Sequence, residues 1–479
     1  MENRKKPTRR DFLKLAGAVS GSSILAACAP AQPAAPAANP TVAMPAVQGI
    51  KVLRFISDET APATVEFYRK AIDEYRKEHS DIDIDLVIIN EDMKVLRATS
   101  AFQTGGDMGI FVTPIAPVPE WIEQGHMLPI TDVIKEIGED QFLPGSRLII
   151  NGADYAMPYQ MNVYAMWYRK DLLDKAGLAV PQNYEELLAA SQALTKDGMF
   201  GIGIPSSDGA DVMQTFLTPT YHQSGLDYFD KKGNLTFDKP ESLEATKRYL
   251  ELMKYAPDGL KAAGSFGDMI NAYVAGQVAF GVYAGRMGIA IESRAPELAD
   301  KTGVTGFSMG PKSSALCNNV FTGYPSWYFI HSKTQYPEEA KQFLKYLMTG
   351  WRGVEFAKTV PGHVLPQIKS VRDEYLAADY DYGKKHSDWI RTLLQLVENA
   401  SNPAVFMGSV VDNKFDRTIN LMPWAGPLFH AGNPLGKMTG SVLLENKPVE
   451  EAWQQAVMEV KQIAETWKAE HPNWKPLGS

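Results

Sequence analysis

The stretch KVLRFISDETAPATVEFYRKAIDEYRKEHSDIDIDLVII, residues 51–89, decides the fold class. Its first run, VLRFIS at 52–57, is mostly apolar and has the composition of a strand. Its last run, DIDIDLVII at 81–89, begins by alternating acidic and apolar side chains, as a strand with one buried face does. Between the two runs, apolar residues recur at helical spacing, namely Val65, Tyr68, Ile72 and Tyr75. The order strand, helix, strand predicts a parallel sheet with helices on its faces, which is the α/β class.

The same alternation of strands and helices continues along the chain. Asn183 stands where a helix N-cap is expected, and Glu186 follows three residues later, as in a capping box. Pro240 stands near the first turn of another predicted helix. Two further helices are predicted from apolar faces, which consist of Ala340, Phe343, Leu344 and Leu347 in one and Trp453, Ala456, Val457, Val460 and Trp467 in the other.

The N-terminal stretch TRRDFLKLAGAVSGSSILAAC, residues 8–28, differs from the rest of the chain. Its apolar part, from Phe12 to Ala27, has 16 residues, which is shorter than the roughly 20 that cross a bilayer. A basic start, an apolar middle and small residues at the end are typical of an export signal. The pair Arg9-Arg10 resembles the twin-arginine type of bacterial signal.

The end of this stretch, Leu25-Ala26-Ala27-Cys28, resembles a lipoprotein processing box. In such a box the cysteine is lipidated and becomes the new N-terminus. We therefore predict a signal peptide over residues 1–27 and lipidation of Cys28. The alternative is an ordinary export signal with a cysteine there by chance. Residues 28–49 are rich in Ala and Pro and carry no charged side chain, so they are predicted to form an extended tether.

Composition limits the class of protein further. Hydrophobic residues make up 45% and charged residues 22%, which are ordinary values for a soluble globular protein. The first 27 residues carry six basic and two acidic side chains, so their removal changes the net charge from -8 to -12. An acidic protein is not expected to bind nucleic acid.

If Cys28 is lipidated, Cys317 has no partner, and no disulfide is predicted. About 430 folded residues are more than one core usually supports, which indicates two lobes.

Four segments together resemble the extracellular solute-binding proteins of ABC importers, in particular the maltose-binding-protein-like, carbohydrate-type group. The first segment matches the group's proline-tyrosine crossover with the strand and helix that follow it. The second matches its helix-strand unit, the third a later helix and the fourth its closing helix. Their order and spacing agree over most of residues 50–479. The segments are YAMPYQMNVYAMWYRKDLLDKAGLAVPQNYEELLAASQAL (155–194), AYVAGQVAFGVYAGRMG (272–288), PEEAKQFLKYLMTGWRGVEFA (337–357) and PVEEAWQQA (448–456).

The resemblance implies a two-lobed periplasmic-binding-protein fold of a type II-like kind. Its parallel-rich sheets are flanked by helices, and strands that cross between the lobes form the hinge. Lobe one is expected to hold residues 50–158 plus 312–345, and lobe two residues 164–305 plus 349–479. The crossings are expected near 160–163, 307–311 and 348–350.

The resemblance also implies ligand-contacting residues in the cleft between the lobes. They come from the loop after the first strand, the crossover, the segment TGYPSW (322–327), expected just before a strand of lobe one, and the segment NLMPWAGPLF (420–429) of lobe two. The alternatives are solvated loop acids or charges at a helix N-terminus for the first group, and core-lining roles for the residues of the crossover and of TGYPSW. The residues are Asp58, Glu59, Tyr159, Asn162, Tyr324, Trp327 and Trp424.

Arg286, in VYAGRMG, departs from the pattern of the sugar-binding relatives, which often carry a ligand-stacking tryptophan at this place. An arginine can stack on a sugar or donate to its hydroxyls. It can equally bind a phosphate or carboxylate with two parallel hydrogen bonds. A third interpretation is a structural salt bridge to an acid such as Asp58 or Glu59. The solute's charge therefore stays open at this point.

An enzyme is the rival class. The segment GFSMG at 306–310 fits the pattern of a nucleophile elbow around Ser308, but that elbow needs a helix directly after the serine. Pro311 and the residues after it predict a loop instead. The sequence contains no zinc-protease motif, no phosphate-binding loop and no Cys/His cluster for zinc. We predict no enzymatic activity, no metal and no cofactor.

The resulting expectation is a lipid-anchored, extracytoplasmic receptor, in the periplasm or at the cell surface. It captures a small solute, a sugar in the first place, by cleft closure and delivers it to the membrane permease of an ABC importer. It is expected to be monomeric and to meet the membrane through its N-terminal lipid. The alternatives are the same role for an anionic or non-sugar solute, such as a sugar or polyol phosphate, a uronate or a polyamine, and an exported hydrolase.

Overall fold

The computed structural model describes residues 49–90, 93–115, 117–205, 215–401, 405–411, 413–429 and 433–476. The predicted signal peptide, Cys28 and the tether up to residue 48 lie outside the described residues. None of the described helices is long and apolar enough to cross a membrane.

The first sheet has the strand order β12-β11-β3-β1-β2, and β6 pairs with the free side of β11. β1 and β2 are parallel and paired from Lys51 with Ile82 to Ser57 with Ile88, which confirms the strand, helix, strand prediction for 51–89. β11 is antiparallel to both β3 and β6. The strands are β1 (Lys51–Ser57), β2 (Ile82–Ile88), β3 (Ile110–Val112), β6 (Ala156–Val163), β11 (Phe321–Ile330) and β12 (Ala400–Ser401).

The second sheet has the order β10-β7-β9-β8. β7 is antiparallel to β10 and β9, and only β8 and β9 are parallel. Both sheets are therefore mixed. In the first sheet the pairs β1–β2, β1–β3 and β11–β12 are parallel, as expected, whereas most pairs of the second sheet are antiparallel. Because the chain returns from the second sheet to the first, β11 runs antiparallel to β3 and β6. The strands are β7 (Ala165–Arg169), β8 (Phe200–Gly203), β9 (Val278–Tyr283) and β10 (Thr302–Gly306).

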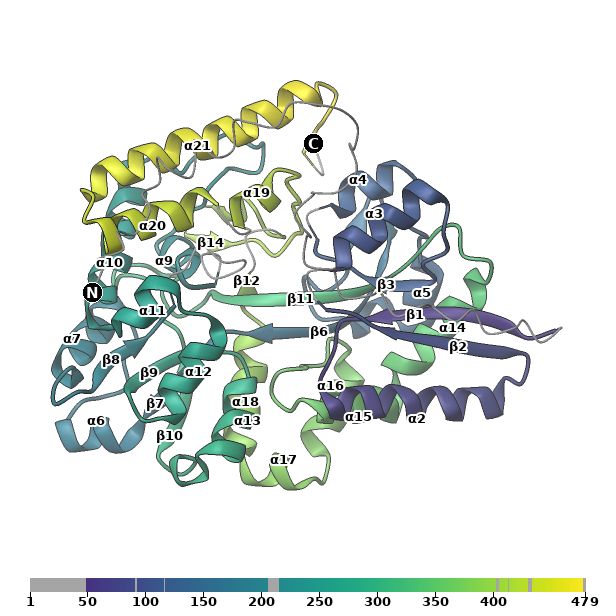
Figure 1. The fold of residues 1–479 in the computed structure, drawn as a ribbon, viewed down its shortest axis with the longest axis horizontal. Helices are drawn as coiled ribbons and strands as arrows, with labels where there is room; N and C mark the ends of the chain where they lie inside the picture. Colours follow the sequence, from purple (N-terminus) through teal and green to yellow (C-terminus); the bar gives the residue numbers. More distant parts are fainter. Residues whose placement is uncertain are drawn as a thin grey trace, which may run out of the picture. The chain divides into compact units, whose positions relative to one another are not determined.

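Helices cover both sheets (Figure 1). α2 packs on β2, and α14 packs on β11 and on α5. Near the first sheet lie α2 (Pro62–Glu78), α3 (Lys94–Thr104), α4 (Val118–Glu123), α5 (Thr131–Ile137), α14 (Pro337–Met348), α15 (Gly350–Thr359) and α16 (Lys369–Ala377).

α7 and α12 pack on the second sheet, and α20 and α21 pack on each other. The remaining helices are α6 (Lys170–Ala176), α7 (Tyr184–Leu194), α9 (Thr218–His222), α10 (Pro240–Leu252), α11 (Asp258–Ala263), α12 (Phe266–Val274), α13 (Arg286–Arg294), α17 (Asp381–Lys385), α18 (Ser387–Val397), α19 (Ala425–Phe429), α20 (Pro434–Glu445) and α21 (Val449–Glu470). Short strand pairs are β4 (Ile149–Ile150) with β5 (Ala153–Asp154), and β13 (Val410–Val411) with β14 (Lys414–Phe415).

The two sheets are connected near the middle of the molecule, where β6 and β11 lie side by side (Figure 1). β6 belongs to the first sheet and continues through Tyr164 directly into β7 of the second sheet. The return connection, residues 307–320, joins β10 to β11. These two connections are near the first two predicted crossings.

The division of the chain into two lobes stays a prediction. Within it, one assignment does not agree with the packing. The prediction places residues from 349 onwards in lobe two, but α15 packs against α2 and α14. Phe356 of α15 lies against Tyr68 of α2, with ring centroids 5.8 Å apart. The chain therefore stays beside the first sheet after Thr349 and does not cross there.

Candidate functional site

Four of the predicted site residues meet beside the β6–β11 pair. Asp58 and Glu59 lie in the loop that follows β1, as predicted. Tyr159 lies on β6, and Arg286 is the first residue of α13, directly after the turn that ends β9. Since these residues come from three separate parts of the chain, only the tertiary fold brings them together.

The ion pair between Glu59 and Arg286 links the loop after β1 to the start of α13. β1 belongs to the first sheet, and α13 follows β9 of the second sheet. Arg286 Nη2 donates to Glu59 Oε2 at 3.0 Å. Gln160 Nε2 donates to the other carboxylate oxygen, Oε1, at 3.2 Å. Glu59 is only 6% exposed, and this burial raises the pKa of its carboxyl group, while the charge of Arg286 acts against the rise. Of the three interpretations of Arg286, the structure contains the salt bridge.

Asp58 has its own cationic partner. Lys94 Nζ donates to Asp58 Oδ2 at 2.6 Å, and the Tyr159 hydroxyl donates to Asp58 Oδ1 at 3.2 Å. Lys94, at the start of α3, was not anticipated from the sequence. Asp58 and Lys94 form one ion pair, and Glu59 and Arg286 form the other.

A row of polar side chains continues from this cluster along β6 and β11. The strand register places Gln160 opposite Ser326 and Asn162 opposite Tyr324. We call these four residues the hinge stripe. A β-bulge lies between Ser326 and Trp327, and Tyr159 is the extra residue on β6. A bulge re-aims the side chain at its position, and here the Tyr159 ring stacks on Tyr328 with centroids 4.3 Å apart.

A group of aromatic rings lies at the second sheet, near the start of α13. The Tyr164 and Phe266 rings are stacked at 5.7 Å, and the Phe266 and Tyr283 rings are 5.2 Å apart. Phe266 and Tyr283 are only partly buried. Sequence reasoning missed this group, although Tyr283 stands three residues before Arg286, and that proximity was an available signal. Partly exposed rings can pack against the C–H faces of a sugar or polyol.

The loop that contains Gly362 and His363 packs directly against Gly285, just before α13. An added Cβ at Gly285 would lie 2.1 Å from the backbone carbon of Gly362 and 2.5 Å from the nitrogen of His363. Glycine is therefore required for this approach. His363 is buried, and its pKa is lowered well below the ordinary value by burial and by the charge of Arg286.

Residues 61–349 match the family described as bacterial extracellular solute-binding protein. This match covers more than half of the chain. The chain belongs to this family of bacterial extracellular solute-binding proteins.

Individual relatives of this solute-binding protein are distant. It is 24% identical to the putative ABC transporter periplasmic-binding protein YcjN of Escherichia coli, over 76% of this chain and 84% of YcjN. It is 25% identical to the mannitol-binding protein of Pseudomonas aeruginosa, over 50% of this chain and 56% of that protein.

Solved structures support the fold. A solute-binding protein of an ABC transporter from Agrobacterium vitis, solved with bound D-mannitol, has a TM-score of 0.66 and 21% identity, and the match covers 88% of this chain and 99% of the other. A likeness at this identity supports the two-lobed periplasmic-binding-protein fold. It does not transfer the solute of that protein to this chain.

Two predicted ligand contacts in this solute-binding protein are corrected. Trp424 is 0% exposed, and its ring lies among Phe229, Trp467 and Trp474 in the hydrophobic core beside the second sheet. Trp327 is 3% exposed and donates its indole N–H to the carbonyl of Ser146 at 2.7 Å. Neither ring has a free face for a solute. The segment TGYPSW lies inside β11 and not before a strand.

The remaining predicted residues stay candidates. Asn162 is buried on β6, and Tyr324 is partly buried opposite it on β11. Both belong to the hinge stripe, and so they lie close to the Glu59–Arg286 pair. Gln160 and Ser326 complete the stripe and were not predicted.

The residues around Ser308 do not form a nucleophile elbow. No helix follows it among residues 307–320, and its hydroxyl bonds to the side chain of Asn318. Another serine, Ser401, lies 2.9 Å from His222 Nδ1, and Asp227 Oδ2 lies 3.6 Å from His222 Nε2. These three side chains are deeply buried, so no substrate reaches the serine. No group of three or more metal-ligating side chains occurs in the described part of the chain.

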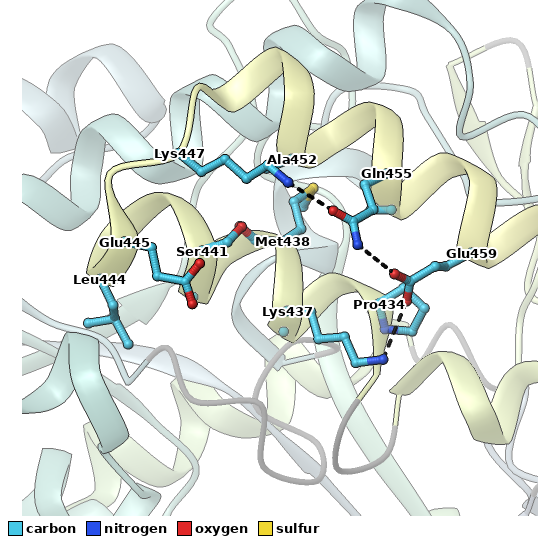
Figure 2. Close-up of a pocket in the computed structure, with 13 residues that line it drawn as sticks. Pro434, Lys437, Met438, Ser441, Leu444, Glu445, Lys447, Ala452, Gln455 and Glu459 are labelled. Carbon is cyan, nitrogen blue, oxygen red and sulfur yellow. Dashed lines mark hydrogen bonds and ion pairs between the residues drawn. The ribbon is translucent and has the colours of Figure 1, made fainter.

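A surface groove between α20 and α21 is a different kind of feature (Figure 2). It encloses about 400 Å³. Polar side chains bond to one another across the groove (Figure 2): Lys437 Nζ donates to Glu459 Oε2 at 3.4 Å, and Lys447 Nζ donates to the amide oxygen of Gln455 at 2.9 Å. It contains none of the predicted site residues, so we assign the candidate site to the region around Glu59 and Arg286.

The buried His363 predicts a pH dependence of stability. Its pKa in the folded state is below the value of about 6.5 in an unfolded chain. Below that pH the unfolded chain binds a proton that the folded protein does not, so the stabilisation is present at higher pH and is lost as the pH falls. We expect His363→Leu to flatten the decrease of the unfolding free energy between pH 7 and 5, measured by urea titration.

The matched control is His471→Gln, because His471 is exposed at the end of α21. This change is expected to leave the pH profile unchanged. His331, another buried histidine with a lowered pKa, keeps some pH dependence in both variants. An unchanged slope in His363→Leu would contradict the assignment.

Proposed function

We propose that this chain is a lipid-anchored extracytoplasmic receptor that captures a small, uncharged, polyhydroxylated solute and delivers it to an ABC importer. The solute is a sugar or a polyol. It binds beside the Glu59–Arg286 pair, between the hinge stripe and the aromatic group formed by Tyr164, Phe266 and Tyr283. The protein binds its solute without changing it.

The observation that carries this proposal is the internal pairing of the charges. Arg286, which could otherwise have bound an anion, is held by Glu59 at 3.0 Å. Lys94 is held by Asp58 at 2.6 Å. An anionic solute bound to Arg286 would lie beside the buried Glu59 carboxylate, and the repulsion between the two negative charges opposes its binding. A neutral solute leaves both pairs intact.

Two further observations support a polyhydroxylated solute. The partly exposed rings of Phe266 and Tyr283 offer apolar faces next to polar side chains, which is the composition of a small-molecule site. The matches to a mannitol-binding protein and to a structure with bound D-mannitol agree with this class. The sugar or polyol phosphates, uronates and polyamines considered from the sequence alone are not favoured.

The location and the partner follow from family and sequence together. Extracytoplasmic solute receptors deliver their solute to a membrane permease, and the match to a putative ABC transporter binding protein supports an importer as partner. Lipidation at Cys28 would keep the receptor near that permease and raise its effective concentration there. Separation of membrane and soluble fractions, before and after Cys28→Ser, checks the anchor.

A thermal-shift screen tests the function. A solute present at about 100 times its dissociation constant stabilises the folded protein by roughly 2.7 kcal/mol. We expect neutral sugars or polyols to raise the melting temperature and sugar phosphates, uronates and putrescine to leave it unchanged. Stabilisation by anions alone would contradict the neutral class, and conversion of the solutes in the same samples would contradict the absence of catalysis.

A further inference from the structure

Three hydroxyl groups contact one another at the base of the loop that carries Asp58 and Glu59. They belong to Ser57, the last residue of β1, to Tyr68 of α2 and to Tyr328 of β11. The Tyr68 and Tyr328 hydroxyl oxygens lie 2.6 Å apart, and Ser57 Oγ lies 3.2 Å from each of them. All three residues are 0% exposed, so a solute cannot reach them. We call these three residues the hydroxyl triangle.

The hydroxyl triangle contains one proton for each of its contacts. Each hydroxyl donates one hydrogen bond and can accept another, so three protons serve the three contacts. Burial raises the pKa of Tyr68 and Tyr328 well above the ordinary value of a tyrosine, and the charge of Glu59 raises both further, so both keep their protons. A buried network is rigid when every member is satisfied. Removal of one hydroxyl leaves each of the other two with one contact instead of two.

Two contacts connect the hydroxyl triangle to the acids of the candidate site. The backbone N–H of Glu59 donates to Ser57 Oγ at 3.3 Å, a bond across two residues that holds the turn of the chain after β1. The Tyr328 ring stacks on the Tyr159 ring with centroids 4.3 Å apart, and the Tyr159 hydroxyl donates to Asp58 Oδ1 at 3.2 Å. The triangle therefore supports Glu59 through its backbone and Asp58 through its side chain.

The hydroxyl triangle also fixes this loop relative to the hinge stripe. Tyr328 lies opposite Met157 in the register of β11 with β6, and two residues of the stripe, Tyr324 and Ser326, lie on the same strand β11. A bond from β1 to Tyr328 thus joins the loop to the strand that carries half of the stripe. A site whose side chains are already held in place loses less conformational freedom on binding, which strengthens binding.

We propose that Ser57, Tyr68 and Tyr328 are positioning residues: their hydroxyl triangle holds the loop of Asp58 and Glu59 in place beside the hinge stripe, and it sets the affinity for the solute without touching it. This inference rests on the proposed function. Without the complete triangle, the solute has to order the loop itself, and part of the binding free energy is lost in doing so.

Isothermal titration of the whole folded protein with D-mannitol, D-sorbitol, D-tagatose and maltose tests the inference. Tyr328→Phe removes one hydroxyl and keeps the ring that stacks on Tyr159. We expect it to weaken binding of the best of these solutes on the order of fivefold, as the loss of one hydrogen bond between neutral groups does. Tyr68→Phe should have a similar effect. The double variant should lose less affinity than the product of the two single losses, because the two hydroxyls bond to each other.

Tyr221→Phe is the matched control. Tyr221 is also 0% exposed, and its hydroxyl lies 2.6 Å from Thr246 Oγ1, the same distance as in the Tyr68–Tyr328 pair. Tyr221 lies on α9 and Thr246 on α10, both outside the candidate site. We expect Tyr221→Phe to lower the melting temperature as Tyr328→Phe does, and to leave the affinity unchanged. An equal loss of affinity in both variants would show an effect of general stability and would overturn the inference.

Amide hydrogen exchange without solute, followed by NMR, separates positioning from a general loosening of β1. In Ser57→Ala the Glu59 N–H loses its acceptor, so we expect it to exchange faster, on the order of tenfold. The Ile89 N–H donates to the backbone carbonyl of Ser57 at 3.0 Å, which this change leaves in place, so its exchange should stay nearly unchanged. Equal acceleration at both amides would show that the whole strand has loosened, and it would contradict the positioning role.

The outcomes distinguish this inference from the function on which it rests. If a neutral solute binds the wild type and the two phenylalanine variants of the hydroxyl triangle equally well, the receptor function stands and the positioning role is overturned. If none of the four solutes binds the wild type, the proposed function fails, and the inference fails with it.

Discussion

Replacement of Arg286 by methionine is expected to lower the free energy of unfolding by about 3 kcal/mol at pH 7, at the lower end of the range for breaking a buried ion pair. The lower end applies because about a third of the Arg286 side chain, 34%, is exposed. The loss arises at Glu59, which stays buried and keeps only the bond from Gln160. Urea unfolding of the purified protein measures the change.

The pH dependence of the stability of Arg286→Met shows whether the unpaired Glu59 carboxylate causes the loss. Burial already raises the pKa of Glu59 in the wild type, and removal of Arg286 raises it further. The folded variant then binds a proton above the unfolded pKa of about 4.3, so its stability increases as the pH falls from 7 towards that value. The double variant Glu59→Gln with Arg286→Met removes the unpaired charge and should recover most of the loss. A small, pH-independent loss in the single variant would contradict the pairing.

Replacement of Trp424 by alanine should have an even larger effect, about 4 kcal/mol, as is typical for a buried tryptophan. Trp424 is fully buried, and the Trp467 and Trp474 rings lie 5.7 Å and 4.8 Å from it. Lys468 also lies over the Trp424 ring at 4.8 Å. The alanine leaves a cavity that these large neighbours cannot fill.

The control for Trp424 is Trp351→Ala on α15, since Trp351 is 49% exposed. This change should cost less than about 0.5 kcal/mol, as exposed substitutions usually do. Calorimetry provides the melting temperatures, and solute titration provides a second test. If Trp424→Phe kept its stability but lost the solute, Trp424 would be a ligand contact after all and the correction reported above would be wrong.

The fold could be predicted where local patterns determine it. Alternation at 81–89 and helical spacing at 65–75 are properties of neighbouring residues, and the predicted β-α-β unit is present. Asn183 accepts from the Glu186 backbone N–H, so the predicted helix start is confirmed. The direction of the strands could not be predicted in the same way, because it depends on where the chain returns.

The site was only partly predictable for the same reason. Asp58, Glu59 and Arg286 were suggested by resemblance and by their charge. Their pairing is a contact between residues far apart in the sequence, and Lys94 and Gln160 carry no local signal of their own.

The errors at Trp327 and Trp424 have a physical origin too. A large aromatic side chain suits both a core and a sugar site, and only its distant neighbours decide between them. For Trp327 the resemblance placed the strand start too late in the sequence. In the structure, Pro325 lies opposite Met161 within β11.

The position of β11 has a consequence for synthesis on the ribosome. β11 is made of residues 321–330, yet it lies between β6 and β3, which emerge far earlier. Until it arrives, the nascent chain holds two unpaired strand edges, which are prone to aggregation. The pairing of β6 and β3 with β11 is therefore delayed until residue 330 has been made, and the two strand edges stay open until then. A secretion route that accepts only finished, folded cargo, as the Arg9-Arg10 pair predicts, suits a protein whose central strand is made so late.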